Sequence, residues 1–402
     1  MLRLDRQSKL SRARQNHTLT HFWGSSMATN TGFSFPRLLA VMGTALLATV
    51  FHSTASFAAD ASQASARATT SSLAHARIIV LATGGTIAAV PDTRSAIGYN
   101  SGGVTGEQIV ASVPGIDKLA NIKAEQISNV GSQDMNDQIW FHLAKRIQEI
   151  FDRNEADGVV ITHGTDTLEE TAFFLENVLH SNKPVVLVGS MRSGGAVSAD
   201  GPGNLYEAVE VAANPQSAGR GVMVVMNDTI QSPRWITKTN TTSVQTFMSP
   251  NAGPIGYVDP ATVRYLAPVA ARKHQVYALP ANPPLPRVEI IYSHSNMDAT
   301  QIDNAVKDGA KGIILAGVGD GNTSAEAIDA LKRAVAKGIV VVRSTRLVSG
   351  FVNRNVEVPD DQDGFVVSYD LNAQKARVLV QLLIANGVTA PDKVQQAFAA
   401  TY

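Results

Sequence analysis

Thr83-Gly84-Gly85-Thr86 is the first stretch of the sequence whose residue types could do chemistry. It follows residues 78–81, a short apolar run typical of a strand buried on both faces of a parallel sheet. The two glycines let the backbone turn sharply and approach a ligand closely, and open α/β sheets bind ligands at the carboxyl ends of their strands. Thr86 is therefore a candidate nucleophile. A plain turn with threonine caps explains the same residues equally well.

A second buried strand, 159–162, is followed by His163-Gly164-Thr165-Asp166-Thr167. The spacing from Thr167 to Glu170 is that of a capping box, so a helix should begin just after Asp166. The N-terminus of that helix would aim N–H groups at the turn, where they would stabilise an anion or a developing oxyanion. The alternative is that Asp166 and Thr167 only cap the helix.

Two further polar stretches could contribute to the same chemistry. Lys238 lies among hydroxyl residues, Thr237 to Thr242, and could accept or relay a proton if burial lowers its pKa. A solvated loop lysine explains that stretch as well. Residues 129–134 carry short polar groups suited to gripping a carboxylate and an ammonium, although alone they also fit a turn.

Several other chemistries lack their sequence signatures. The chain has no cysteine, so it has no disulfide, thiolate nucleophile or Cys-based metal site. The HExxH, GxSxG and P-loop motifs are also missing from the sequence. Residues 317–321 follow a predicted strand, but they do not match GxGxxG and a plain turn explains them better. The sequence therefore implies neither a metal nor an organic cofactor.

The first 58 residues are typical of a targeting segment. An apolar run at 38–50 has the length of a signal-peptide h-region, and small residues further on allow cleavage after Ala58. We therefore predict a signal peptide with a long n-region at 1–58, followed by a flexible Ala/Ser/Thr-rich tether at 59–76. The alternative is an uncleaved amino-terminal anchor.

Charge indicates which partners the exported chain could have. The whole chain has 34 basic and 34 acidic residues, a balance that argues against a general nucleic-acid binder. Residues 1–58 hold six basic and one acidic residue, so the remainder has 28 basic and 33 acidic residues and a net charge of −5. Such a product fits a mildly acidic soluble export protein without stable membrane association after cleavage.

Apolar runs alternate with helical patterns from residue 77 onward, which predicts βα units and parallel sheets. The proline-crowded stretch 278–287 cannot be helix or central strand and is typical of a semi-rigid linker. We therefore predict an α/β chain with a larger N-terminal catalytic domain at 77–277 and a smaller C-terminal α/β domain at 288–402. The predicted strands are 78–82, 159–162, 185–188, 222–226, 288–292, 313–316 and 339–342; the predicted helices are 135–151, 299–308, 325–337, one after residue 166 and one from residue 372.

Taken together, these motifs resemble the bacterial type II, periplasmic L-asparaginases and the related glutaminase-asparaginases. The resemblance covers nearly all of 77–402. Its two signature stretches are Thr83-Gly84-Gly85-Thr86-Ile87-Ala88 and the His163-to-Thr167 turn. Further matching stretches are 131–137, 191–192, 198–201, 226–228, 237–240, 316–319 and 374–377.

The resemblance implies an amidohydrolase that converts L-asparagine to L-aspartate and ammonia through a threonine acyl-enzyme. In the family pattern Thr86 is the nucleophile, and Tyr99 lies on a mobile lid loop that closes over it. Thr165, Asp166 and Lys238 form a second set that moves protons and positions or activates water. The Thr165 N–H and neighbouring backbone would stabilise the oxyanion.

The resemblance also implies how substrate is held and how the protein assembles. Ser132, Gln133 and Asp166 would grip the α-carboxylate and α-amino group of the substrate. Asn296 and Glu357 match residues that the smaller domain of a neighbouring subunit contributes, so the site would be completed only in an intimate dimer. The family norm is a homotetramer, a dimer of dimers, and the signal peptide places it in the periplasm or outside the cell.

Two questions stay open at the level of sequence. A periplasmic amino-acid-binding protein without turnover would also have two α/β domains and a signal peptide, although it has no need of a threonine pair. The ratio of asparaginase to glutaminase activity is the second question. One extra methylene changes binding by only about 1–3 kcal/mol, which small changes in lid or pocket wall could supply or remove.

Overall fold

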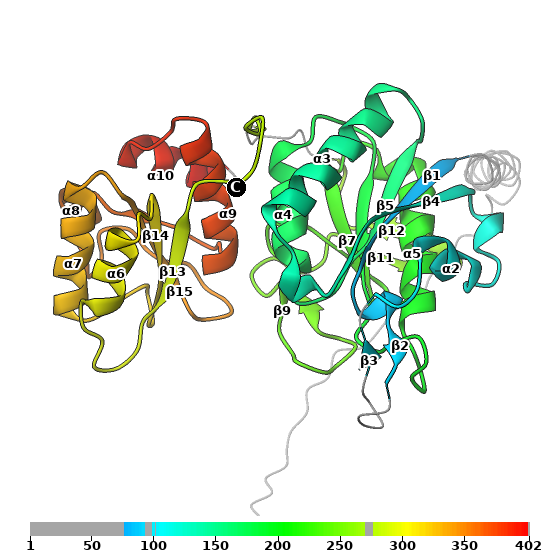
Figure 1. Ribbon diagram of the computed structural model, residues 1–402, viewed down its shortest axis with the longest axis horizontal. Coiled ribbons are helices and arrows are strands. Elements are labelled where there is room, and N and C mark those ends of the chain that lie inside the picture. The colour runs from blue at the N-terminus through cyan, green and yellow to red at the C-terminus, as the bar shows by residue number, and fades with distance from the viewer. Residues whose placement is uncertain (1–75, 93–98, 101, 270–275, 401–402) are drawn as a thin grey trace, which may run out of the picture. The chain divides into compact units, whose positions relative to one another are not determined.

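Two main sheets, each with helices on both faces, form the core of the computed structural model of this chain (Figure 1). It describes residues 76–92, 99–100, 102–269 and 276–400, all within one compact unit, Asp60–Tyr402. The predicted fold class is confirmed: the chain is α/β, with a larger, mainly parallel N-terminal sheet and a smaller C-terminal parallel sheet. No helix in the described ranges has the length and apolar character needed to cross a membrane.

The large sheet is parallel through its centre. Its strands, in spatial order, are β12 (Thr262–Tyr265), β11 (Gly256–Asp259), β8 (Thr229–Gln231), β7 (Val222–Met226), β6 (Val185–Val188), β5 (Gly158–Thr162), β1 (Arg77–Gly84) and β4 (Asn121–Val130). The five strands from β4 to β7 run parallel, and β8, β11 and β12 continue the sheet antiparallel. Parallel strands end at one edge, so the residues after β1 and β5 meet there.

The apolar run of β1 is buried on both faces of this sheet. Ile79 and Leu81 belong to the core beneath α3 and α4, whereas Ile78 and Val80 belong to the core beneath α2 and α5. This arrangement explains why the run is continuous instead of alternating. The helices are α2 (Gly106–Ala111), α3 (Asp137–Asp152), α4 (Leu168–Val178) and α5 (Gly201–Ala213).

Short elements surround the carboxyl edge of the large sheet, where the predicted site residues lie. β2 pairs with β3, and β9 pairs with β10, both antiparallel. The short elements near this edge are η1 (Thr86–Ala88), β2 (Val90–Pro91), β3 (Tyr99–Asn100), η3 (Ser132–Asp134), β9 (Thr237–Lys238) and β10 (Phe247–Met248). Two others, η2 (Ile116–Lys118) and η4 (Pro215–Ser217), lead into β4 and β7 at the opposite edge.

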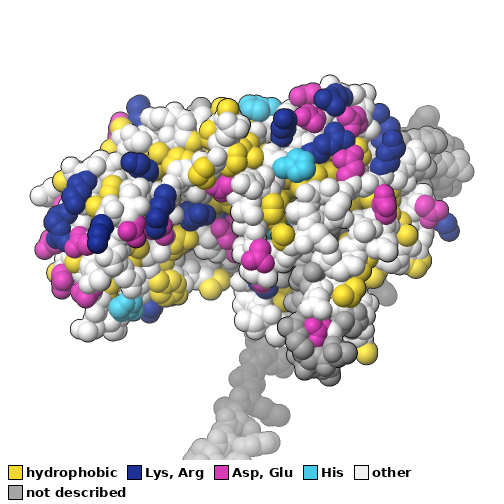
Figure 2. Space-filling view, in the orientation of Figure 1, with side chains coloured by type: hydrophobic (Ala, Val, Ile, Leu, Met, Phe, Trp, Pro, Cys, Tyr) yellow, Lys and Arg dark blue, Asp and Glu magenta, His cyan; other side chains and the backbone are white. Residues whose placement is uncertain are grey.

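The C-terminal domain is a four-stranded parallel sheet in the order β13 (Val288–Tyr292), β14 (Gly312–Gly317), β15 (Val340–Thr345) and β16 (Val366–Val367). Its helices are α6 (Thr300–Lys307), α7 (Ala325–Ala336), α8 (Asp360–Asp363), α9 (Ala373–Ala385) and α10 (Pro391–Ala400). α6 and α7 cover one face of the sheet, and α9 packs on the other face and on α4. Basic and acidic side chains are interspersed over the outer side of this domain in Figure 2, as expected for amphipathic helices.

The prediction of a capping box at the start of α4 is wrong, because the hydrogen bonds that define a capping box are not formed there. Thr167 is the N-cap residue, but its side chain makes no cap to the helix. Its hydroxyl instead donates to the Ser132 carbonyl at 2.7 Å. The helix therefore begins where the pattern indicated, while the threonine ties it to η3, a long-range partner that local spacing cannot reveal.

Two glutamates on the buried side of α5 hold protons more tightly than usual. Burial raises the pKa of Glu207 to about 8, and neighbouring Asp228 adds to the effect. Burial likewise raises the pKa of Glu210 to about 7. In the unfolded chain both would titrate near their ordinary value of 4.5. The folded state thus binds more protons between about pH 4.5 and 8, so the free energy of unfolding falls as pH rises through that window.

We therefore expect Glu210→Gln to stabilise the fold at pH 8 by about 1–3 kcal/mol, because the neutral amide removes the penalty of a buried charge. At pH 5 the change should be small, since Glu210 already carries its proton in the folded state. Thermal unfolding at both pH values measures this difference. Glu107→Gln, at an exposed glutamate of α2, is the matched control. If Glu210→Gln stabilised the fold equally at pH 5 and pH 8, relative to wild-type, the raised pKa would not belong to Glu210.

Candidate active site

A small polar cavity of about 120 Å³ lies where β1 and β5 end. Six of the sequence-predicted site residues line it, and they come from four separate stretches of the chain. These six are Thr86, Ser132, Gln133, Thr165, Asp166 and Lys238; the other lining residues are Gly85, Gly164, Met191 and Thr241. Met191 had been recognised only as part of a family-like stretch, and Thr241 only as one of the hydroxyl residues around Lys238; neither had been given a role in the site.

The turns after β1 and β5 touch each other through glycine backbone. A Cβ atom on Gly85 would lie 2.3 Å from the Gly164 α-carbon, and Gly85 has a φ of +81°. A Cβ on Gly164 would in turn lie 2.7 Å from the Ser132 hydroxyl oxygen. Only glycine fits at these positions without displacing backbone. The close approach brings the two hydroxyl-bearing turns, separated by about eighty residues of sequence, to one cavity.

Thr86 opens the short helix η1 immediately after this contact. Its side chain is 7% exposed, and η1 holds it against the cavity wall. The neighbouring hydroxyl, Thr83, is used differently, because it donates to the Thr162 carbonyl at 2.9 Å and is buried in the sheet. Of the two threonines in the motif, only Thr86 therefore presents its side chain to the cavity.

Lys238 links the second hydroxyl to a carboxylate. Its ammonium donates to the Thr165 hydroxyl oxygen at 2.9 Å and to Asp166 Oδ1 at 2.7 Å. The lysine side chain is 18% exposed and the aspartate side chain 60% exposed, so the pair lies at the mouth of the cavity. The geometry suits transfer of a proton between the amine and the Thr165 hydroxyl, with the carboxylate balancing the charge.

Ser132 connects η3 to the start of α4. Its hydroxyl accepts the Asp166 N–H at 3.0 Å, and its carbonyl accepts the Thr167 hydroxyl at 2.7 Å. A serine hydroxyl has one proton as well as its acceptor lone pairs, so the O–H remains available to a ligand in the cavity. Gln133, the next residue, is exposed at the cavity rim.

His163 is a buried member of the site that sequence reasoning did not single out. Burial lowers its pKa to about 4, so it is neutral at pH 7. Its Nδ1 lies 2.7 Å from the Gly164 carbonyl, which can only accept, so Nδ1 carries the proton. Its Nε2 then accepts from the Thr171 hydroxyl at 2.9 Å, which itself accepts from Trp140 Nε1 at 2.8 Å. This chain of hydrogen bonds fixes the turn that carries Thr165.

Three predicted residues are not among the described residues that line this cavity. The backbone of Tyr99 pairs with Pro91 in the β2–β3 hairpin, but its side chain and residues 93–98 of the predicted lid are outside the described residues. Asn296 and Glu357 are exposed in the C-terminal domain, where Glu357 accepts a hydrogen bond from Asn322. None of the residues that line the cavity comes from that domain.

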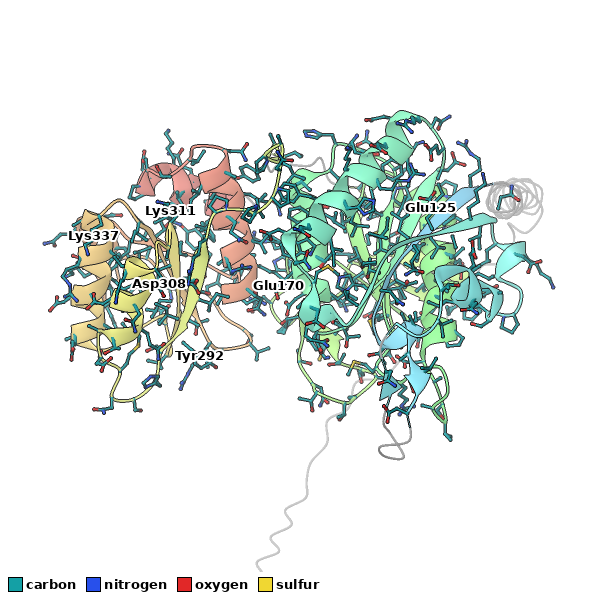
Figure 3. All side chains as sticks on the ribbon, in the orientation of Figure 1. Glu125, Glu170, Tyr292, Asp308, Lys311 and Lys337 are labelled. Carbon is teal, nitrogen blue, oxygen red and sulfur yellow. The ribbon has the colours of Figure 1, made fainter. Side chains whose placement is uncertain are left out.

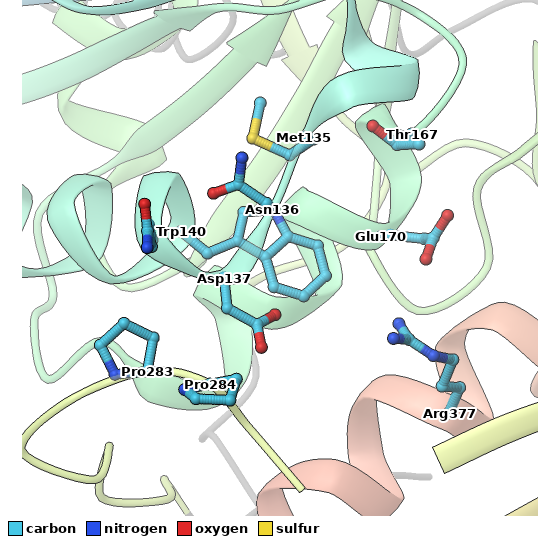
Figure 4. Close-up of a pocket in the computed structure, with 10 residues that line it drawn as sticks. Met135, Asn136, Asp137, Trp140, Thr167, Glu170, Pro283, Pro284 and Arg377 are labelled. Atoms are coloured by element: carbon cyan, nitrogen blue, oxygen red, sulfur yellow. The ribbon is translucent and has the colours of Figure 1, made fainter. Parts of the chain in front are cut away.

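A larger cavity, about 640 Å³, lies between α3, α4, the linker and α9 (Figure 4). It contains Trp140 and Thr167, and Glu170 faces Arg377 across it. Burial raises the pKa of Glu170, partly offset by Arg377. No sequence-predicted site residue lines this space, so size alone does not identify the reactive site. Within the described ranges, no three His, Asp or Glu side chains are grouped as metal ligands would be.

Comparison with known proteins agrees with this geometry. Residues 77–270 match the family model described as asparaginase, N-terminal, and residues 287–398 match the glutaminase/asparaginase C-terminal domain. The chain is 46% identical to L-asparaginase 2 of Escherichia coli over 81% of this chain and 93% of that protein. It is also 46% identical to a probable periplasmic L-asparaginase of Haemophilus influenzae (80% and 92%) and 41% identical to a glutaminase-asparaginase of Pseudomonas fluorescens (77% and 86%).

Proposed function

This chain belongs to the asparaginase family, and from that premise we propose that it hydrolyses L-asparagine to L-aspartate and ammonia with Thr86 as the nucleophile. The matches of both domains and the named relatives confirm the predicted resemblance. They also favour an amidohydrolase over a binding protein, with side activity on L-glutamine as in the relatives named for both substrates.

The observation that carries the proposal is the position of Thr86 beside the Thr165–Asp166–Lys238 set in one small polar cavity. A threonine hydroxyl needs an activating group, and a proton acceptor must lie within reach of the reacting atoms. Two hydroxyls, an amine and a carboxylate satisfy both requirements. A protein that only binds amino acids would gain nothing from the second hydroxyl and the lysine.

In the first step the Thr86 oxygen bonds to the side-chain carbonyl carbon of asparagine. The oxyanion that forms lies near the backbone N–H groups at the start of α4, where the helix dipole favours negative charge. The C–N bond then breaks, and the proton released by the Thr86 hydroxyl is delivered to the departing nitrogen, giving ammonia. Lys238 acts through the Thr165 hydroxyl: its ammonium gives a proton toward the departing nitrogen and regains one from the Thr86 hydroxyl, so its charge is the same before and after the step.

In the second step water adds to the ester carbon, and the bond to the Thr86 oxygen breaks to release L-aspartate. Asp166 and Lys238 assist by taking a proton from the water and returning one to Thr86. Ser132, Gln133 and Asp166 hold the zwitterionic end of the substrate: the free Ser132 O–H suits the α-carboxylate, and the exposed Asp166 carboxylate suits the α-ammonium. The small polar cavity fits such a substrate.

Assembly of subunits would complete this site. Asn296 and Glu357 do not line the cavity of their own chain, and both are exposed. The C-terminal domain also exposes several large apolar side chains: Tyr292 (labelled in Figure 3), Leu347, Val348, Phe351 and Val356. Burial of such side chains against a partner subunit would be favourable. We therefore propose a homotetramer in which a partner subunit presents these two residues, with Tyr99 on the lid.

Mixing two inactive variants should test this sharing of residues. Thr86→Ala and Glu357→Ala impair different parts of one composite site, so each alone should be nearly inactive. Dissociation and reassembly of an equal mixture should restore activity to about a quarter of wild-type, because half of the dimers are mixed and each of these contains one intact site. Ammonia release before and after reassembly measures the gain. A mixture that stays inactive would exclude sharing across subunits.

Export completes the proposal. We propose that residues 1–58 act as a signal peptide and that the mature protein works in the periplasm. This rests on the sequence pattern and on the relative named as periplasmic. Cell fractionation, with amino-terminal sequencing of the mature protein, tests it. A periplasmic form that begins after Ala58 would support the assignment, and a cytoplasmic full-length form would refute it.

The reaction itself is tested by ammonia release from purified mature protein with L-asparagine and L-glutamine in parallel. Turnover of asparagine well above that of glutamine is the expected result. Comparable rates would make the protein a glutaminase-asparaginase, with the difference set by the lid or pocket wall. Stoichiometric binding of asparagine without release of ammonia would refute the proposed hydrolase activity and favour an amino-acid-binding protein.

A further inference from the structure

We propose that Lys375 and Glu169 form a positioning pair through which the C-terminal domain of the same chain sets the place of the Lys238 ammonium beside Thr165. Neither residue lines the cavity, so neither is a catalytic residue. The inference rests on the proposed role of Lys238. It adds a cause for the geometry of that lysine, which lies on the two-residue strand β9 with few local constraints.

Lys375 is a fully buried cation directed at the segment before Lys238. It lies on α9, is 1% exposed, and donates to the Arg234 carbonyl at 3.0 Å and to the Ile236 carbonyl. Its third partner is Glu169 Oε2 at 3.4 Å. An ammonium has three donors, and all three are used. Two of them hold backbone carbonyls within four residues of Lys238, so Lys375 fixes the path of the chain into β9.

The buried Glu169 carboxylate accepts hydrogen bonds from residues of both domains. It is 5% exposed and lies in the first turn of α4, three residues after Asp166. Its Oε1 accepts from the Thr237 hydroxyl at 3.1 Å and from Gln374 Nε2 at 3.0 Å, and its Oε2 accepts from Asn372 Nδ2 at 2.9 Å. Thr237 is the first residue of β9 and directly precedes Lys238. The Glu169 carboxylate therefore connects the start of β9 to α4, the helix that follows Thr165 and Asp166.

A second buried pair reinforces the same attachment. Asp370 forms an ion pair with Arg234 and accepts from Trp235 Nε1 at 2.9 Å. The chain from Arg234 to Thr237 is thus held at consecutive positions by residues 370–375 and by Glu169. A buried ion pair with every donor satisfied adds little net stability, but it specifies one arrangement. The function of this arrangement, we infer, is to fix the Lys238 ammonium at hydrogen-bond distance from Thr165.

Two substitutions test the pair. Thr237→Val removes one hydrogen bond to Glu169 and keeps the shape of the side chain; kcat should fall about 5–10-fold. Lys375→Met releases both carbonyls, and kcat should fall about 10–100-fold, since a displacement near 1 Å can cost two orders of magnitude. KM should change little in either variant, because the substrate-gripping residues are untouched.

Matched controls separate positioning from general damage. Arg146→Met removes a cation that bridges Glu125 and Glu155 on the far side of α3, and Thr229→Val removes a hydroxyl that donates to the Met226 carbonyl. Both should lower the melting temperature without changing kcat or KM. If Lys375→Met does not fold, Thr237→Val still decides the question.

A double-mutant cycle gives the sharpest outcome. In a Lys238→Met background, Thr237→Val should leave the residual kcat unchanged, because the group that it positions is gone. Equal losses in both backgrounds, or a loss of activity that appears in KM and not in kcat, would overturn the proposal. These results are distinguishable from failure of the proposed function, which would appear as normal turnover in Thr86→Ala.

Discussion

Thr86→Ala should lower kcat with L-asparagine by about four orders of magnitude or more, because the step that forms the acyl-enzyme loses its nucleophile. Binding should persist, since Ser132, Gln133 and Asp166 remain in place around the cavity. The fold should persist as well, because alanine fits the first position of η1. Ammonia release measures kcat, and calorimetric titration with asparagine measures the dissociation constant of the inactive variant.

The neighbouring threonine supplies the control for this experiment. Thr83→Val removes a hydroxyl from the same motif, but that hydroxyl donates to the Thr162 carbonyl inside the sheet. Its loss should reduce the free energy of unfolding by about 1 kcal/mol and leave kcat of the folded enzyme near wild-type. Thr86→Ser, which keeps an oxygen at the reacting position, should retain part of the activity. Near-normal turnover in Thr86→Ala would remove Thr86 from the nucleophile role.

The strands that the sequence predicted well are those buried on both faces. β6 and β7 were predicted with the bounds that the structure has, because continuous apolar runs leave little doubt about their ends. The bounds of β13 were also predicted correctly, although it is an edge strand with partly exposed side chains. β4 was missed, although it pairs with β1 over most of its length. It is an edge strand whose side chains are mixed and only partly buried, so neither a continuous run nor a clean alternation marks it.

Helix α5 was missed for a different reason. It begins Gly201-Pro202-Gly203, a sequence that locally indicates a turn. Its later residues, among them Leu205, Val209 and Ala212, pack on the sheet. Tertiary packing stabilises this helix despite its weak start. The antiparallel strands β8, β11 and β12 are short and follow turn residues, so they also lack a strong local signal.

The candidate site could be predicted as far as its residues stand in motifs. Six of nine predicted side chains line one cavity because strand ends in a parallel sheet converge. The supporting residues were not predicted: Glu169 and Lys375 act through partners far away in the sequence, and the partners of His163, Gly164 and Thr171, are near in sequence but carry no local signal of their role. One local signal existed for Lys375: it occupies the apolar face of α9, where a lone cation needs a buried partner. The domain boundaries and the signal peptide stay predictions.

The two domains of one chain contribute to the site in different ways. The N-terminal domain supplies the reacting groups, and its own C-terminal domain holds the strand that carries Lys238. The exposed residues Asn296 and Glu357 would serve a neighbouring chain instead. The C-terminal domain therefore has a role within the chain and another between chains, and variants at Lys375 and Glu357 separate the two.

Lys238→Met should lower kcat about 10²–10⁴-fold, the usual contribution of a general acid–base group. The ammonium that bonds Thr165 and Asp166 would be lost, while the apolar stem of the side chain would be retained. Asp166 is largely exposed, so it stays solvated and the fold should survive. Lys311→Met, at an exposed lysine of the C-terminal domain labelled in Figure 3, controls for loss of a positive charge and should leave kcat unchanged.

Lys238→Arg then distinguishes proton transfer from charge alone. Arginine keeps the positive charge beside Asp166, but a guanidinium does not release its proton at any accessible pH. If Lys238 moves a proton, the arginine variant should be about as impaired as the methionine variant. If the lysine only balances the charge of Asp166, arginine should restore most of the activity lost in Lys238→Met. Recovery to near wild-type kcat would therefore show that Lys238 acts as an electrostatic partner of Asp166 and not as a proton carrier. The proton acceptor for the Thr165 hydroxyl would then be solvent or substrate.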